Sequence, residues 1–211
     1  MGKLLNGING PFSGKVGTVV GTTWRGIPVI RSKPTPRKGG FSPLELQQQA
    51  KFSLMNKFLR PLNALLSETF KPVAVQMTGF NKAFSFNVKN AITGLHPGLA
   101  VDYPMVLLGR GDLPNAASPT AASSLEGKLD FTWTDNSGKG KTLATDKAFV
   151  AAYNEELNKW KFSLDAAVRS AGSCSLDATE FKGKGAHTYI GFISADGKDV
   201  TDSLYTGLVN L

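Results

Sequence analysis

Residues able to act as nucleophiles or metal ligands are few and widely separated in this 211-residue sequence. It contains two histidines, His96 and His187, and one cysteine, Cys174. A Ser-His-Asp triad or a multi-histidine metal site needs such residues close together. A single cysteine allows neither an intramolecular disulfide nor a cysteine-based metal cluster. We therefore expect both histidines to be structural and Cys174 to be a small, partly buried thiol.

Acidic residues and glycine-rich runs also lack the spacing that chemistry needs. Glu155 and Glu156 are adjacent, and a second acidic set is formed by Asp196, Asp199 and Asp202. A general acid and base must face each other across a cleft, which neighbours on a turn seldom do, and the EF-hand pattern is absent. The run GKVGTVVG at residues 14–21 lacks the Lys-Ser/Thr ending of a phosphate loop. The sequence predicts no enzyme, no cofactor and no metal.

Positive charge is concentrated at the N-terminus. The chain has a net charge of +8, and residues 1–40 hold seven lysines and arginines but no acid. Such a segment favours contact with phosphates, with Trp24 or Phe12 stacking on bases. Two other interpretations are a lysine-protected sheet edge and a set of short strands that gain a core by pairing with a neighbouring subunit. The predicted contacts with a partner or polyanion are Lys15, Trp24, Arg25, Arg31, Lys33, Arg37 and Lys38.

The elements that carry these residues can be read from local signals. Closely spaced glycines forbid a helix over the first 40 residues, so we expect short strands at 16–20, 22–24 and 27–31, then an extended arm at 32–40. Ser42, Pro43 and Glu45 form a capping box that predicts a helix start. An apolar stripe continues to about residue 65, Pro61 kinks or ends the helix, and a second segment runs to about residue 70. A further helix is predicted at 81–93 and a strand at 101–108.

The second half of the chain changes to a period-two pattern. Residues 113–124 (LPNAASPTAASS) are rich in Ala, Ser and Pro, which predicts a linker. Beyond it, apolar and polar residues alternate at 129–134, and further strands are expected at 148–153, 160–164, 166–169, 187–194 and 203–211. The predicted fold is mostly β (α+β). It comprises a basic β arm (1–40), a helical segment packed with the arm (41–112), a linker (113–124) and an antiparallel β-sandwich of immunoglobulin or fibronectin type III kind (125–211).

Several motifs along the chain suggest a family. The segments MGKLLNGINGPFSGKVGTVVG, TTWRGIPVIRSKP, NVKNAIT, GRGDLP and SADGKDVTDSLYTG together resemble a family of uncharacterised proteins encoded in Bacteroidota genomes. The resemblance spans nearly the whole chain. It implies a bacterial origin and a characteristic N-terminal glycine-rich motif, and it assigns no functional residue.

These observations favour a non-catalytic structural or assembly protein that self-associates through its glycine-rich strands and arm. The alternative is a nucleic-acid-binding protein that uses the basic arm. A phage-derived protein falls under this alternative. An enzyme with an unrecognised site and a binding module for a small molecule or sugar are further alternatives. Without an apolar run of membrane-spanning length or a secretory signal, we expect no membrane contact and either a cytoplasmic location or assembly outside the cell by an unconventional route.

Overall fold

The fold is taken from a computed structural model that describes residues 2–3, 10–24, 26–36, 39–125 and 127–211. Three of the predicted contact residues, Arg25, Arg37 and Lys38, lie outside the described residues. The chain divides into two compact units, Met1–Phe41 and Ser42–Leu211, and each is described by itself.

The N-terminal unit is a four-stranded antiparallel sheet in the order β1-β4-β3-β2. Gly17 and Gly26 precede β3 and β4 with φ angles of 57° and 80°, a region in which glycine is unstrained. Short strands with glycine turns were predicted here, and the strand predicted at 27–31 is confirmed as β4. The predicted strand at 16–20 was wrong, because residues 17–18 form the turn between β2 and β3, and β3 continues through Gly21 instead of starting after it. The strands are β1 (Gly2–Lys3), β2 (Gly14–Val16), β3 (Val19–Trp24) and β4 (Ile27–Ser32).

The helical segment of the second unit begins at a cap that the local sequence encodes. Ser42 Oγ accepts a hydrogen bond from the Glu45 N–H at 3.4 Å, and Glu45 Oε2 accepts one from the Ser42 N–H at 2.9 Å. Helix α1 ends just before Pro61, whose ring cannot continue a helix. Both features were predicted. The helical elements are α1 (Pro43–Leu59), η1 (Arg60–Leu62), α2 (Asn63–Thr69), η2 (Lys71–Val73) and α3 (Gly79–Asn90).

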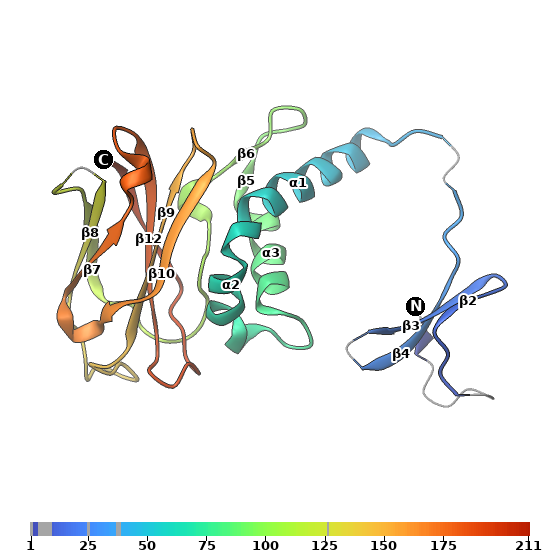
Figure 1. The fold of residues 1–211 in the computed structure, drawn as a ribbon, viewed down its shortest axis with the longest axis horizontal. Coiled ribbons are helices and arrows are strands. Elements are labelled where there is room, and N and C mark those ends of the chain that lie inside the picture. The colour runs from blue at the N-terminus through green and yellow to red at the C-terminus, as the bar shows by residue number, and fades with distance from the viewer. Residues whose placement is uncertain (1, 4–9, 25, 37–38, 126) are drawn as a thin grey trace. The chain divides into compact units, whose positions relative to one another are not determined.

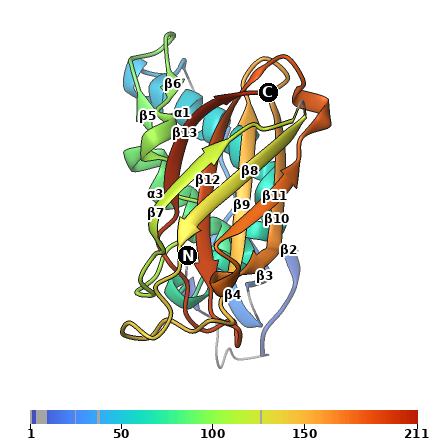
Figure 2. The ribbon, with the colours of Figure 1, turned by 90° about the vertical axis from the view of Figure 1, so that its left-hand side faces the viewer.

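Two antiparallel sheets follow, in the orders β10-β9-β12-β13 and β11-β8-β7. Figure 2 shows the three-stranded sheet lying in front of the four-stranded one, with the helices behind both. The chain is thus mostly β with a helical segment. The strands are β7 (Ala117–Ala122), β8 (Lys128–Thr134), β9 (Lys147–Asn154), β10 (Lys159–Val168), β11 (Ser173–Asp177), β12 (Gly185–Ile193) and β13 (Leu204–Asn210), with short helical turns η4 (Arg169–Ala171) and η5 (Thr179–Phe181).

Strand β9 is apolar on both faces because it lies between two cores. Ala148, Val150 and Ala152 belong to the cluster between the two sheets. Phe149 and Tyr153 belong to the cluster beneath the helices, which cover the other face of the four-stranded sheet (Figure 1). A strand buried on both faces loses the alternation that marks a half-exposed strand.

The predicted linker at 113–124 was wrong, because residues 117–122 form strand β7. This strand lies at the edge of its sheet, where Pro119 can be accommodated although it has no N–H to donate. Its composition of Ala, Ser, Thr and Pro is polar for a strand, so the sequence pattern concealed it. Leu113 and Ala116 are buried in the core between the sheets, which ties this segment to the sandwich.

Two other predictions are corrected in the helical half. The predicted strand at 101–108 is limited to β6 (Ala100–Val101), which pairs with β5 (Ile92–Thr93), and is followed by η3 (Tyr103–Met105), because Pro104 interrupts strand pairing. The helical segment and the sandwich form one compact unit rather than two, since the helices share a core with the four-stranded sheet. The predicted packing of the arm against the helical segment stays a prediction.

Candidate functional site

Strand register gathers cations on one face of the N-terminal sheet. Lys15 lies opposite Val20, which lies opposite Arg31, so the three side chains project from the same face. In the next row Lys3 lies opposite Val29, on that same face by the two-residue alternation of β4. Lys3, Lys15 and Arg31 are all exposed. The face therefore has the positive charge that the sequence predicted.

Other predicted contact residues lie close to this face. Trp24 pairs with Ile27 at the end of the β3–β4 ladder, on the same face by alternation, and its side chain is 51% exposed. Lys33 follows β4, and its N–H donates to the Thr18 carbonyl at 2.8 Å. Lys3 had not been predicted as a contact. It could be added only through the pairing of β1 with β4, because those strands are far apart in sequence.

Phe12 has a different role from the predicted stacking role. A Cβ atom on Gly21 would lie 2.3 Å from the Phe12 carbonyl oxygen and 2.7 Å from two of its ring atoms. Gly21 pairs with Ile30, on the face opposite the cations. Phe12 therefore packs over Gly21, where only glycine fits.

Replacement of Gly21 with alanine is expected to loosen the N-terminal sheet. The added methyl group has to displace the Phe12 backbone, an overpacking that costs about 1–3 kcal/mol. Because 1–2 kcal/mol changes an equilibrium about five- to thirtyfold, tryptic cleavage after Lys15 and Arg31 should accelerate by about that factor. The matched control is Gly40→Ala, since a Cβ there meets nothing within 4 Å. Equal cleavage rates in the two variants would contradict the packing role of Phe12.

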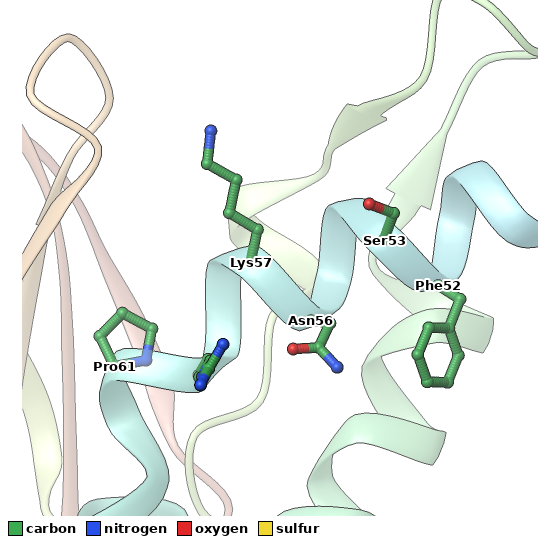
Figure 3. Close-up of a pocket in the computed structure, with 6 residues that line it drawn as sticks. Phe52, Ser53, Asn56, Lys57 and Pro61 are labelled. Carbon is green, nitrogen blue, oxygen red and sulfur yellow. The ribbon is translucent and has the colours of Figure 1, made fainter.

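The first two thirds of helix α1 form a second exposed surface. Residues 43–54 are all exposed or half-buried, and Leu44 and Phe52 are 75% and 56% exposed. Figure 3 shows Phe52, Ser53, Asn56 and Lys57 along the helix, with Pro61 where it ends; with Arg60 these side chains line a shallow hollow of about 670 Å³. Phe52 makes an edge contact with the Phe84 ring of α3, but residues of α1 are fully buried only from Met55 onward.

Cys174 and His187 are packed among other side chains, as residues that stabilise a fold are. Burial raises the pKa of the Cys174 thiol to about 12, so the thiol is protonated and poorly nucleophilic at neutral pH. The His187 ring stacks on Tyr103 with 3.7 Å between ring centroids, and its Nδ1 lies 2.9 Å from the Tyr205 hydroxyl oxygen. Burial lowers the pKa of His187. His96 is exposed in the loop between β5 and β6.

Asp196 and Asp202, from the acidic set at 196–202, accept hydrogen bonds that stabilise turns and loops. Asp196 Oδ1 accepts hydrogen bonds from Ser194 Oγ and the Lys198 N–H, and these bonds with the nearby Lys198 ammonium lower the pKa of Asp196 to about 2. Asp202 Oδ1 accepts instead from the Gly111 N–H at 3.1 Å. Among the described residues, no group of three or more His, Cys, Asp or Glu side chains is placed to hold a metal ion.

Sequence patterns did not reveal two clusters in the larger unit. One is a hollow of about 380 Å³ where α1, β6 and the end of β9 meet, lined by aromatic rings of Phe58, Tyr103 and Tyr153 and by charged Lys57 and Glu155. The other is the fully buried ion pair of Arg169 with Asp146. The members of both clusters are far apart in sequence, so no local signal could have identified them.

Comparison with known proteins shows which family this chain represents. Residues 11–207 match a family of unknown function, DUF6266. The chain belongs to this family. The matched range begins at Pro11, so it includes most of the glycine-rich N-terminal motif of this DUF6266 protein, the N-terminal sheet from β2 onward and the sandwich as far as β13.

Other comparisons add little to the DUF6266 assignment. The solution structure of the fibronectin type III domain of the human collagen α1(XX) chain is similar to part of this chain. The alignment covers 46% of this chain and 84% of the collagen domain, with 11% sequence identity and a TM-score of 0.34. A likeness this weak carries no argument about kinship. No match was found among curated proteins. Every helix in the described parts of this DUF6266 protein is too short or too polar to cross a membrane.

Proposed function

We propose that this chain is a non-catalytic structural or assembly protein whose N-terminal sheet makes contacts between subunits. The observation that carries the proposal is the small core of that sheet. Among its described residues, 2–3, 10–24, 26–36 and 39–41, only Gly21 and Val29 are buried. A small sheet is stable only when a further layer covers its apolar surface. A second copy of the chain supplies that layer in our proposal.

The exposed part of helix α1 supports the same function. Leu44 and Phe52 present apolar surface along a helix that a capping box and Pro43 start without help from packing. Helices of this length gain most of their stability in proteins from a packed apolar face. A neighbouring subunit that covers residues 44–52 would complete the stripe.

The sandwich is the displayed part of the proposed assembly. We propose that it is of the fibronectin type III kind, a class that serves as a spacer or interaction module in many proteins. Its seven consecutive strands, arranged antiparallel as β10-β9-β12-β13 and β11-β8-β7, support this assignment. We also propose a bacterial origin, with the glycine-rich segment before β3 as the characteristic motif.

One observation favours a second function, nucleic-acid binding. The register of the N-terminal sheet brings Lys3, Lys15 and Arg31 to one face with Trp24. Cations that contact phosphates and an aromatic ring that stacks on a base are the elements of sequence-tolerant single-strand binding. Such binding weakens steeply as salt rises, because counterions condensed on the nucleic acid are released.

The two functions predict different solution masses. Under the assembly proposal, light scattering of nuclease-treated protein should show large particles at low and at high salt. Material purified without nuclease should have the 260/280 nm absorbance ratio of protein. Replacement of Lys3, Lys15 and Arg31 with glutamine should leave those particles intact. A monomer that carries nucleic acid only at low salt, and loses it in the glutamine variant, would contradict assembly and support the second function.

A further inference from the structure

One face of helix α3 collects polar and basic side chains. Lys82, Ser85, Phe86 and Lys89 follow at spacings of three, one and three residues, which places them together along one side of the helix. The side that carries Ala83 and Asn87 is buried against the rest of the unit. The basic side is thus the one that α3 leaves open.

Contacts on the buried side of α3 hold the segment that carries Arg110, so that Arg110 lies next to the exposed side of the helix. Asn87 Nδ2 donates to the Leu107 carbonyl and Asn87 Oδ1 accepts from the Leu107 N–H, both at 2.9 Å. The Arg110 N–H donates to the Thr69 carbonyl at 3.2 Å. A Cβ on Gly111 would lie 2.3 Å from the Val200 carbonyl oxygen, so the loop packs closely against the connection between β12 and β13. Arg110 and Gly111 are half-buried, whereas Asp112, the last residue of this Arg-Gly-Asp tripeptide, is exposed.

The guanidinium of Arg110 is oriented by an aromatic ring. Its central carbon lies 4.6 Å from the centroid of the Phe86 ring, within the range of a cation–π contact. A guanidinium that stacks on an aromatic ring keeps the N–H donors at its edge for hydrogen bonds. Phe86 therefore positions Arg110 beside the lysines of α3.

The result is a hollow of about 160 Å³ with three cations and no carboxylate in its lining. Its remaining lining groups are the Ser85 hydroxyl, the Phe86 ring and the Asn90 amide. Within the part of the chain that the structure describes, none of Lys82, Lys89 and Arg110 forms an ion pair. Asp202, the acid bound to the same loop, accepts from the Gly111 N–H and does not line the hollow.

We propose that this hollow is a binding site for a phosphoryl group. A tetrahedral oxyanion offers several acceptor oxygens, which a guanidinium edge, two ammonium groups and a hydroxyl can contact together. Arginine supplies two parallel donors and lysine supplies compact charge, a combination that suits phosphate. The size of the hollow fits a single such group, and its charge disfavours neutral and cationic ligands. The site lies in Ser42–Leu211 and does not depend on the function proposed for the N-terminal sheet.

The test is a titration of the full-length protein with inorganic phosphate at constant ionic strength. Calorimetry should show saturable binding of one phosphate per chain. Lys82→Gln with Lys89→Gln should weaken binding by about tenfold or more, because each charged hydrogen bond contributes substantially. Arg110→Lys should weaken it several-fold although the charge is unchanged, since the paired donors are lost.

The control removes the same charge elsewhere. Lys139→Gln with Lys141→Gln alters two exposed lysines in the turn between β8 and β9 and should leave the affinity unchanged. Absence of saturation, or equal weakening in the control, would overturn the proposal in favour of general charge attraction. A melting curve shows whether the Arg110→Lys variant is folded. If it is unfolded, the phosphate affinity of the Lys82→Gln with Lys89→Gln variant still tests the proposal. A phosphate monoester and a phosphate diester as further titrants distinguish a free or terminal phosphate from a polymer backbone.

Discussion

A chain that begins at Ser42 is expected to be a monomer, whereas the full chain is expected to form large particles. The N-terminal sheet provides the proposed subunit contact and is a separate compact unit, so its removal takes away the contact without opening the core of Ser42–Leu211. The truncated protein should therefore keep the melting temperature of the larger unit. Light scattering gives the mass, and circular dichroism gives the melting curve.

The control for this truncation keeps the sheet and changes only its charge. The glutamine variant of Lys3, Lys15 and Arg31 should assemble like the wild type, because the proposed contact is made by apolar surface. A truncated protein that still forms particles would sink the role given to the sheet and would direct attention to the exposed part of α1. A glutamine variant that dissociates would show that charge rather than apolar burial holds the particles together.

Replacement of Asp146 with alanine is expected to cause a large loss of stability. Asp146 and Arg169 are fully buried, with 3.0 Å between Asp146 Oδ2 and Arg169 Nε. The guanidinium also donates to Asn136 Oδ1 at 2.8 Å and to the Pro114 carbonyl at 3.0 Å. Loss of the carboxylate leaves a buried positive charge without its partner, which costs about 3–5 kcal/mol. The melting temperature should fall by about 10 °C or more.

A surface pair supplies the matched control for this substitution. Asp165 Oδ2 lies 2.6 Å from Lys147 Nζ, and the two side chains are 57% and 45% exposed. Asp165→Ala should cost about 1 kcal/mol or less, because solvent screens the pair. A double variant, Asp146→Leu with Arg169→Met, should lose less stability than Asp146→Ala, since no charge is left buried. If Asp146→Ala and Asp165→Ala melt alike, burial of the Arg169 pair does not matter to stability.

Some elements of this fold are predictable because their signals are local. The start of α1 depends on Ser42, Pro43 and Glu45, which interact within one turn, and its end depends on Pro61. Strand β8 alternates apolar and polar residues because its two faces meet the core and solvent. Such patterns act over a few residues, so the sequence contains them without any tertiary partner.

Other elements escaped prediction because neighbours decide them. Strand β7 has the composition of a linker and is a strand only because β8 pairs with it. Strand β11 (Ser173–Asp177) was not predicted at all, since its short sequence is half polar and it gains its place from pairing with β8. The boundary expected at 113–124 fails for a related reason: helices and sheet share one core that no local pattern describes.

The position of the positive charge, the start and end of helix α1, and the presence of short strands with glycine turns at the N-terminus all follow from the amino-acid sequence. Tertiary structure alone decided which cations share a face, because the pairing of β1 with β4 and of β2 with β3 sets the side on which Lys3 and Lys15 project. It also brought Arg110 to the lysines of α3 and enclosed Arg169 with Asp146. The physical reason is that propensity and capping act between near neighbours in the chain, whereas register, burial and charge clustering depend on residues that only folding brings together.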